Sequence, residues 1–304
     1  MKIVIWGYPL HTHTHSYIHS SFYKAFEYLG HDVYWFHDDE YPEDFDYDDC
    51  IFLTEGFADK NIPLNETSTY FVHVCVNPKK YLGKVKKLID VRYLQESMDN
   101  DNYDFVLDRD NCTQLDTGIL YDDKSDEYDI IYAGWATDLL PFEIDFDWIG
   151  LPRENKYYFV GSTSGDGRFA NAHLINEFAG YCKEVGVDFV YVNPWVNPVS
   201  DEENRILTQK SFISPDFRNA THKKWGYLAC RLVKSISYGQ LGLTNSPINA
   251  KFVDKSVICK EDIRELFDEG LKYKDNKDLI RHQMEVVKFN HTYLNRINGM
   301  LKVL

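Results

Sequence analysis

The first part of the chain alternates short apolar runs with polar stretches, as α/β proteins do. Residues 2–6 (KIVIW) form an apolar run closed by Gly7, residues 16–29 carry apolar side chains at helical spacing, and residues 32–36 (DVYWF) are apolar again. Short apolar runs bounded by turn residues indicate buried strands, and spacings of three and four indicate a helix. The order strand, helix, strand predicts the beginning of a parallel, Rossmann-like sheet.

Further apolar runs extend this pattern to residue 133. We expect four more strands, at residues 50–55, 69–76, 103–108 and 128–133. The acidic stretch 37–49 between them is typical of a loop. The lysines between residues 79 and 87, with Arg92 beyond them, are spaced as on one amphipathic helix with a solvated face.

The pattern restarts after residues 134–155, a segment without clear periodicity. Residues 156–162 (KYYFVGS) predict a strand, the next stretch up to Gly186 a helix, and residues 187–193 another strand. Helices are also expected at 223–239, 260–273 and 278–304, with a short strand at 255–259. We therefore predict an α/β protein of two Rossmann-like domains that face each other across a cleft. Their expected bounds are residues 1–140 and 141–285, with residues 286–304 as a C-terminal helix that packs back on the first domain.

Length and charge narrow the possible functions. A chain of 304 residues is long enough for two domains of ordinary size. Its net charge of −15 repels a phosphate backbone, which disfavours nucleic acid as a partner. The six cysteines are scattered without a CxxC pair, so neither a zinc module nor a disulfide framework is indicated. Without a recognisable signal peptide or membrane-spanning stretch, we expect a cytoplasmic protein.

A glycine-rich turn opens the second domain. The sequence from Gly161 to Arg168 (GSTSGDGR) follows a predicted strand and precedes a predicted helix. Glycines let a ligand approach the backbone, and a helix N-terminus presents free N–H groups to an anion. Arg168 can bind a diphosphate with two parallel hydrogen bonds. The pattern is neither GxGxxG nor a Walker loop, and an ordinary strand–helix turn explains it equally well.

A second group of polar residues lies near residue 240. Arg231 and Lys234 are three apart and share one face of a helix. The small-residue turn Thr244-Asn245-Ser246 follows and offers hydroxyls, an amide and backbone N–H groups. Two cations beside such a turn suit a sugar diphosphate, although surface charge and a helix cap would produce the same pattern.

Alternating histidines follow the first strand. His11, His13 and His15 stand in the sequence HTHTH, with His19 one helical turn further on. One of them can act as a general base or bind an acceptor hydroxyl. A second interpretation is a polar loop, and a third is a metal site like the one that opens amidohydrolase-type barrels. The later histidines do not continue such a ligand series, so we expect no bound metal.

The order of these pieces resembles the GT-B glycosyltransferases, whose second domain begins with a strand and a loop facing the donor diphosphate. Residues 225–301 resemble the C-terminal part of group-one and CgeB-like glycosyltransferases, and residues 135–141 resemble the entry to their hinge. The matching features are Arg231, Lys234, Tyr238-Gly239, Thr244-Asn245-Ser246 and the closing motif from His291 to Arg296. Retaining members carry a Glu-x7-Glu pair where this chain has Tyr238-Gly239, so the stereochemistry of transfer stays open.

The resemblance implies a metal-independent, cofactor-free transferase of glycan biosynthesis. It would move a sugar from a nucleotide-sugar donor, UDP- or GDP-linked, to a glycan, protein or small-molecule acceptor. The residues implied for donor binding are Gly161, Ser162, Arg168, Arg231, Lys234, Tyr238, Gly239, Thr244, Asn245 and Ser246. On the acceptor side, His15 and His13 would be catalytic, and acceptor contacts would come from Tyr8, His11, Trp135 and Asp138. Two alternatives remain open: a metal-dependent hydrolase built on the HTHTH histidines, and a nucleotide-sugar-binding relative without catalysis.

Overall fold

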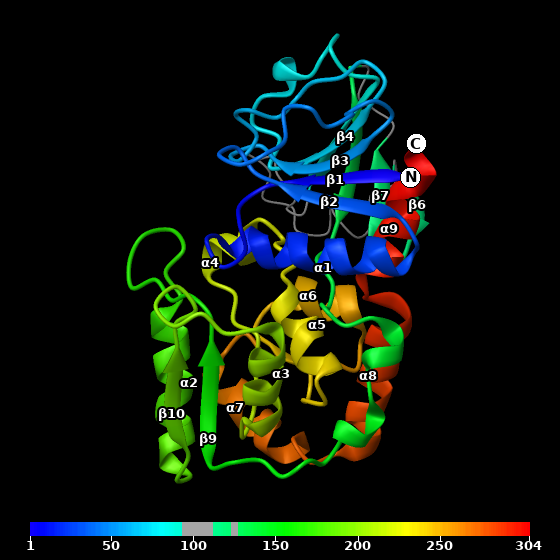
Figure 1. Ribbon diagram of the computed structural model, residues 1–304. Helices are drawn as coiled ribbons and strands as arrows, with labels where there is room; N and C mark the ends of the chain where they lie inside the picture. Colours follow the sequence, from blue (N-terminus) through cyan, green and yellow to red (C-terminus); the bar gives the residue numbers. More distant parts are fainter. Residues whose placement is uncertain (93–111, 123–126) are drawn as a thin grey trace. The chain divides into compact units, whose positions relative to one another are not determined.

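The structure is a computed structural model that describes residues 1–92, 112–122 and 127–304, and these form two compact units (Figure 1). Unit 1 contains the described residues up to Trp135 together with Tyr293–Leu304, and unit 2 contains Ala136–Thr292. The chain thus passes into unit 2 after Trp135 and returns to unit 1 after Thr292. The strand predicted at residues 103–108 lies outside the described residues.

Unit 1 is built on one sheet with the strand order β2-β1-β3-β4-β5-β8-β7-β6 among the described residues. Its parallel strands are β1 (Lys2–Trp6), β2 (Asp32–Phe36), β3 (Ile51–Glu55), β4 (Thr69–His73), β5 (Lys87–Arg92) and β8 (Asp129–Ala133). An antiparallel hairpin of β6 (Cys112–Asp116) and β7 (Ile119–Asp122) extends the sheet beyond β8. The predicted parallel sheet is therefore confirmed, but the hairpin was not foreseen.

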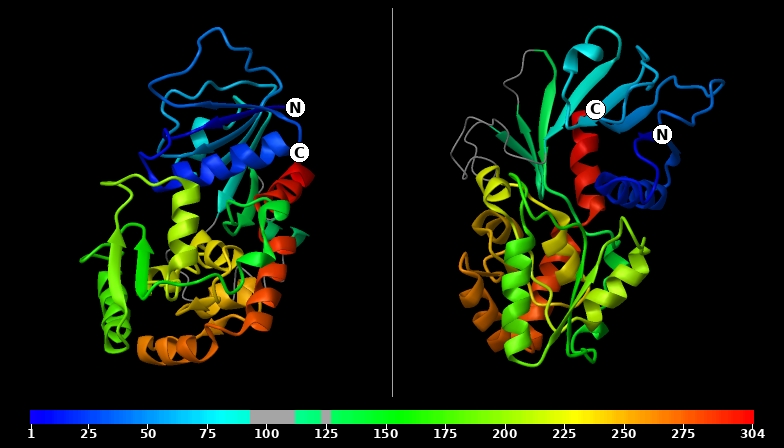
Figure 2. Two further views of the ribbon diagram at one scale, coloured as in Figure 1. Left: turned by 60° about the horizontal axis from the view of Figure 1, so that its bottom comes forward. Right: turned by 90° about the vertical axis from the view of Figure 1, so that its left-hand side faces the viewer.

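The two faces of this sheet are covered differently. Helices α1 (Thr14–Tyr28) and α9 (Tyr293–Met300) lie side by side, with the rings of Phe22 and Tyr293 4.5 Å apart (Figure 2). The short 3-10 helix η5 (Leu301–Val303) follows α9. On the other face, the loops after β2, β3 and β4 contribute Phe45, Leu64 and Tyr81 to a core with the strands. Asp is frequent in the loop after β2, and the loops after β3 and β4 each contain one Pro and one Gly; these residues disfavour crossover helices.

The lysine-rich segment after β4 does not form the predicted amphipathic helix. Only the 3-10 helix η1 (Pro78–Lys80) forms there, and Gly83 adopts φ +73°, which interrupts helical geometry. Lys87–Arg92 is instead strand β5, which pairs with β4 on one side and β8 on the other. Its aliphatic residues Leu88, Ile89 and Val91 are buried, as in a strand in the interior of a parallel sheet.

Unit 2 contains a second parallel arrangement. β9 (Lys156–Val160) pairs with β10 (Asp188–Val192), and β11 (Leu243–Thr244) pairs with β12 (Ile258–Cys259). The extended segment 211–216 joins the two pairs, because Phe212 N donates to Lys156 O at 2.7 Å and Asp216 N to Leu243 O at 2.8 Å. The resulting order β10-β9-(211–216)-β11-β12 is a doubly wound sheet with its switch point beside β9.

Helices surround this second sheet. Buried side chains of α2, α5, α7 and α8, such as Phe178, Ile236, Leu266 and Met284, form its core with the strands. The helices of unit 2 among the described residues are α2 (Ala172–Glu184), α3 (Asp201–Lys210), α4 (Ala220–Lys224), α5 (Cys230–Ser237), α6 (Pro247–Val253), α7 (Ile263–Tyr273) and α8 (Lys277–Asn290), with the 3-10 turns η3 (Pro141–Glu143) and η4 (Phe146–Trp148).

Two helices predicted as continuous are each split in two. The predicted helix 223–239 is interrupted after α4, where Gly226 adopts φ +63°, and resumes as α5. The predicted helix 278–304 is divided between α8 and α9 at His291–Thr292. There the His291 carbonyl accepts a hydrogen bond of 3.0 Å from Thr137 N, so tertiary pairing replaces a helical turn. Both breaks come from tertiary contacts or backbone angles that helical periodicity does not encode.

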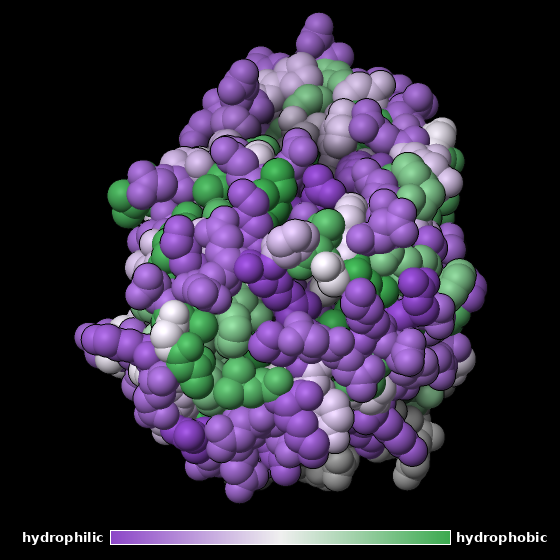
Figure 3. Space-filling view, turned by 90° about the horizontal axis from the view of Figure 1, so that it is seen from below, coloured by the Kyte–Doolittle hydropathy of each residue, from purple (hydrophilic) through white to green (hydrophobic). Residues whose placement is uncertain are grey.

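Figure 3 shows one face of the molecule, on which hydrophilic side chains predominate around smaller hydrophobic areas. Across the described part of the chain, no helix is both long and apolar enough to cross a bilayer.

Candidate functional site

The carboxyl ends of β1 and β3 form a first candidate site, in unit 1. The strand order reverses here, because β2 lies on one side of β1 and β3 lies on the other. In open parallel sheets, ligands bind in the crevice at such a switch point, outside the carboxyl ends of the strands. Helix α1 begins at this edge, and its first turn therefore brings side chains close to the end of β3.

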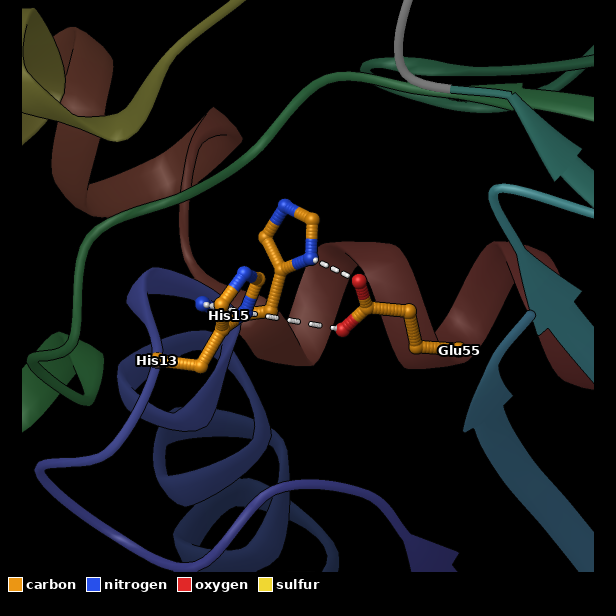
Figure 4. Close-up of side chains that lie close together, drawn as sticks. All are labelled: His13, His15 and Glu55. Carbon is orange, nitrogen blue, oxygen red and sulfur yellow. Dashed lines mark hydrogen bonds and ion pairs between the residues drawn. The ribbon is translucent and has the colours of Figure 1, made fainter. Parts of the chain in front are cut away.

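Three side chains meet at this edge. His13 and His15 come from the start of α1, and Glu55 is the last residue of β3 (Figure 4). His15 Nδ1 lies 2.9 Å from Glu55 Oε1, and His13 Nδ1 lies 3.8 Å from Glu55 Oε2. The Glu55 side chain is 1% exposed, that of His15 12% and that of His13 37%. The cluster is thus a buried carboxylate approached by two imidazoles and open to solvent at His13.

The local sequence positions these imidazoles. His13 is the N-cap of α1, and its Nδ1 accepts a hydrogen bond of 3.3 Å from the His15 backbone N–H. The helix also approaches β1 closely at Gly7, where an added Cβ would lie 2.3 Å from the ring of His19. A larger residue than glycine would therefore displace the start of α1 from the end of the sheet.

A buried pair of histidines lies next to the cluster. The Nε2 atoms of His19 and His73 are 2.8 Å apart, and both residues are buried. Burial lowers the pKa of His19 to about 3 and holds the pKa of His73 well below 6.5. Both rings are therefore neutral at pH 7, so one N–H can donate to the other ring. The His73 ring lies 5.0 Å from that of His15 and 5.7 Å from that of Trp135.

The other side chains predicted for the acceptor side are distributed unevenly. The Tyr8 ring lies 4.3 Å from that of His13, and the Trp135 ring lies 6.5 Å from that of His15. His11 adopts φ +69°, and its Nδ1 lies 3.3 Å from Tyr17 Oη. Tyr8 and Trp135 thus border the cluster, while His11 contacts a neighbouring residue on the helix. Burial also lowers the pKa of His13, although the Glu55 carboxylate opposes this shift.

A second candidate site lies at the end of β9, in unit 2. Arg231 is near the start of α5, and its Nη2 donates a hydrogen bond of 2.7 Å to the carbonyl of Val160. The guanidinium also lies 4.3 Å from the centre of the Phe159 ring. No carboxylate of the described residues forms an ion pair with it. Burial is the main cause that lowers the pKa of Arg231, and the charge of the nearby Arg218 adds to it. A pKa lowered in this way indicates a cation that is partly removed from solvent.

Gly161 allows this approach of arginine to backbone. It follows β9 with φ +149°, and an added Cβ would lie 2.3 Å from Arg231 Nη2. Ser162 is exposed in the same turn, and Arg168 is exposed further along it. The Arg168 guanidinium lies 4.8 Å from the Phe169 ring and 5.4 Å from the Trp225 ring. The glycine-rich turn and the start of α5 thus place Arg168, Arg231 and neighbouring aromatic rings at the carboxyl edge of the second sheet.

Lys234 and Tyr238 meet Asp138 inside unit 2. Lys234 Nζ lies 3.3 Å from Asp138 Oδ2, and the Tyr238 hydroxyl donates to the same carboxylate at 2.6 and 2.7 Å. Gly239 follows Tyr238 at the end of α5 with φ +86°, and an added Cβ there would lie 3.1 Å from the Trp148 carbonyl oxygen. Asp138, predicted for the acceptor side, thus contacts two residues predicted for the donor side. The ammonium charge of Lys234 is already balanced by a buried carboxylate.

The Thr244-Asn245-Ser246 turn is buried and takes part in internal hydrogen bonds. The Thr244 hydroxyl donates to Asp216 at 2.9 Å, and the Asn245 side chain bonds both backbone groups of Arg218. Asp216 in turn forms a buried ion pair with Arg218. The Ser246 side chain caps α6. This turn therefore holds the Asp216–Arg218 pair in place at the edge of the sheet, close to Arg231.

Comparison with known proteins identifies the fold. No family model matches the chain, and no curated protein matches it. An alpha-glucosyltransferase (AGT) solved in complex with UDP is similar over 97% of this chain and 96% of its own, with a TM-score of 0.55 and 11% identity. At that identity the likeness shows the fold alone. The chain has the GT-B fold.

Two further solved structures align over 100% of this chain and 99% of their own. One is a T4 phage beta-glucosyltransferase, with a TM-score of 0.49 and 10% identity. The other is a DNA-modifying beta-glucosyltransferase studied with and without its substrate uridine diphosphoglucose, with a TM-score of 0.48 and 12% identity.

Sequence reasoning missed Glu55, Asp216 and Arg218. Glu55 is the last residue of a predicted strand, and His73 is the last residue of the next strand in the sheet. Because carboxyl ends of parallel strands share one edge, the end positions of the predicted strands were a signal that could have placed both residues near His15. Asp216 had no such signal, because the extended segment before it has no recognisable strand pattern.

Proposed function

We propose that this protein is a glycosyltransferase that moves a sugar from a UDP- or GDP-linked donor to a hydroxyl acceptor. The observation that carries the proposal is the desolvated Arg231 guanidinium beside Gly161, in a fold shared with an alpha-glucosyltransferase solved with UDP. Arg231 is partly buried and contacts a carbonyl and an aromatic ring, with no carboxylate partner among the described residues, so its charge favours binding of an anion such as a nucleoside diphosphate. The resemblance of residues 225–301 to group-one and CgeB-like enzymes supports the same assignment.

The donor diphosphate binds at the carboxyl edge of the unit 2 sheet. Arg231 and Arg168 offer cations, and the backbone of Gly161–Ser162 allows close approach. As the bond from the sugar to the diphosphate breaks, these cations stabilise the negative charge of the leaving group without a metal ion on the donor side. Lys234, Tyr238 and the Thr244–Ser246 turn support this edge through their buried contacts.

The acceptor hydroxyl binds in unit 1, at the cluster of His13, His15 and Glu55. Tyr8 and Trp135 border the cluster and offer apolar ring surfaces to a sugar or similar acceptor. The acceptor loses its proton here, and His15 and His13 are the proposed catalytic residues. The net charge of −15 favours a glycan, protein or small molecule over nucleic acid as the acceptor.

A hydrolase of the amidohydrolase-barrel type is not compatible with unit 1. Its sheet has two ends, at β2 and β6, in the described part of the chain, whereas a barrel closes on itself. The alternating histidines therefore belong to the edge of an open sheet.

The test is a transfer assay that measures release of UDP or GDP from their sugar conjugates in the presence of candidate acceptors. Acceptors would include oligosaccharides, peptides, small alcohols and duplex DNA. We expect acceptor-dependent release that His15→Ala reduces by roughly a hundredfold or more. His37→Ala, which removes a surface His–Glu pair of unit 1, is the matched control and should leave release unchanged. Absence of release and of nucleotide binding with every donor would overturn the proposal, and release driven by DNA would overturn only the choice of acceptor.

A further inference from the structure

We propose that His13, His15 and Glu55 bind a divalent cation of the Zn²⁺ type on the acceptor side. This inference deepens the proposed function, because it names the group that activates the acceptor hydroxyl. Metal binding itself rests only on the geometry of the cluster. The histidine pattern alone did not predict a metal, and the new observation is the buried carboxylate of Glu55, which supplies a third ligand.

The ligand set is suited to this class of metal. Two imidazoles and one carboxylate form a common site for catalytic zinc, in which a fourth position stays open for water or substrate. The three ligand atoms lie within 4.8 Å of one another. Around a tetrahedral Zn²⁺, neighbouring ligand atoms are about 3.3 Å apart. His15 Nδ1 lies 2.9 Å from one oxygen of the carboxylate, Oε1, and His13 Nδ1 lies 3.8 Å from the other, Oε2, so the two separations lie on either side of that value.

The charge of the cluster also favours a cation. Glu55 is buried, and no Lys or Arg of the described residues forms an ion pair with it. A buried carboxylate needs a compensating positive charge, and the groups that approach Glu55 are the imidazoles of His13 and His15. A divalent ion bound between the three side chains would supply that charge.

The site is accessible and needs little rearrangement. His13 is partly exposed, which gives an entry path to the ligand atoms. His13 Nδ1 accepts a hydrogen bond of 3.3 Å from the backbone N–H of His15. Coordination of a metal by this nitrogen would replace that long hydrogen bond. Gly7 and His19 hold the start of α1 against the end of β1, so the two imidazoles stay aimed at β3.

In the transfer reaction, the acceptor oxygen occupies the open position. With His13 and His15 acting as metal ligands instead of as bases, the metal would lower the pKa of the bound hydroxyl, whose O–H bond breaks and releases one proton to solvent. The oxygen then forms a bond to the sugar while the bond from sugar to diphosphate breaks. Acceptor and nucleotide sugar thus become the glycoside, the nucleoside diphosphate and one proton.

The experiment uses the full chain, stripped of metal with a chelator and titrated with Co²⁺ and Zn²⁺ by absorption spectroscopy and calorimetry. We expect one equivalent to bind, more weakly at pH 5.5 than at pH 7.5 because protons compete for the ligands. Glu55→Gln and His15→Ala should each lower the affinity by roughly a hundredfold or more, since even changes to residues that only hold a ligand in place cost about 10–100-fold. His37→Ala removes another His–Glu pair of unit 1 and should change affinity less than about twofold.

Metal binding no tighter in the wild type than in His15→Ala, or an equal loss in His37→Ala, would overturn the metal site. UDP binding, measured in parallel on the metal-free protein, separates the two proposals. Nucleotide binding without metal binding overturns the metal site and leaves the transferase in place. Metal binding without binding of any nucleotide overturns the transferase and leaves the metal site.

Discussion

His15 and Glu55 belong to different elements, α1 and β3, yet His15 Nδ1 lies 2.9 Å from Glu55 Oε1. The contact exists because both residues stand where the strand order of unit 1 reverses. Unit 2 has an equivalent edge, where Arg231 reaches the end of β9. The chain therefore gathers imidazoles and a carboxylate at the edge of one sheet and arginines at the edge of the other, and the proposed acceptor and donor sites rest on these two groups.

Gly161 should be required for binding of the nucleotide. Gly161→Ala places a Cβ 2.3 Å from Arg231 Nη2 at a φ of +149°, so the guanidinium has to move. We expect the dissociation constant for UDP to rise roughly tenfold, which corresponds to about 1.4 kcal/mol. Gly165→Ala is the matched control in the same turn, because an added Cβ there meets no atom within 4 Å. Equal affinities of the two variants in calorimetry would contradict this role.

The buried histidine pair should make stability depend on pH. In the unfolded chain His19 titrates near 6.5, whereas its folded pKa is about 3. Below pH 6.5 the unfolded state binds a proton that the folded state excludes, so the free energy of unfolding falls as pH decreases from about 6.5 toward 3. Between pH 7.5 and 5.5 the loss from His19 is about 1.4 kcal/mol.

Urea unfolding at these two pH values tests this expectation. His19→Gln should lose less stability than the wild type on acidification, by about the amount that one histidine contributes. His173→Gln, at an exposed position of α2, should lose as much as the wild type. A His19→Gln protein with the pH dependence of the wild type would show that the pair is not neutral in the folded state.

Lys234 should matter strongly for stability. Lys234→Met removes the cation that lies 3.3 Å from the buried Asp138 carboxylate. Breaking a buried pair in this way costs about 3–5 kcal/mol, because the remaining charge stays desolvated. Lys272→Met, on the exposed side of α7, is the control and should change the unfolding free energy by less than about 0.5 kcal/mol. Chemical denaturation of the two variants distinguishes these outcomes, and similar values would show that Asp138 does not depend on Lys234.

The sequence was sufficient for the architecture because buried parallel strands are continuous apolar runs. The bounds of β1, β2 and β9 were predicted to within one or two residues from such runs alone. The lysine-rich segment before β5 was misread because a spacing of basic residues does not distinguish a solvated helix from a loop and a strand. The segment 211–216 was missed because its pairing comes from neighbouring backbone, not from its own apolar pattern.

The candidate sites were only partly predictable. The pairing of Gly161 with Arg231 joins two motifs that the sequence had singled out separately. Glu55 was missed because a single acidic residue at a strand end indicates a site only once the order of the strands in the sheet is known. Asp138, Lys234 and Tyr238 were predicted for opposite sides of a cleft and instead meet in one buried network, which no local pattern shows.

The most direct test of the central claim is the affinity of the purified protein for UDP and GDP, measured by calorimetry on the wild type, Arg231→Gln and Arg264→Gln. A charge-assisted hydrogen bond contributes about 1.5–3 kcal/mol, so Arg231→Gln should weaken binding roughly 10- to 150-fold. Arg264 lies on the surface of α7, paired with Glu184, and its variant should bind like the wild type. If the wild type binds neither nucleotide, or if Arg231→Gln binds as tightly as the wild type, the proposed donor site is wrong.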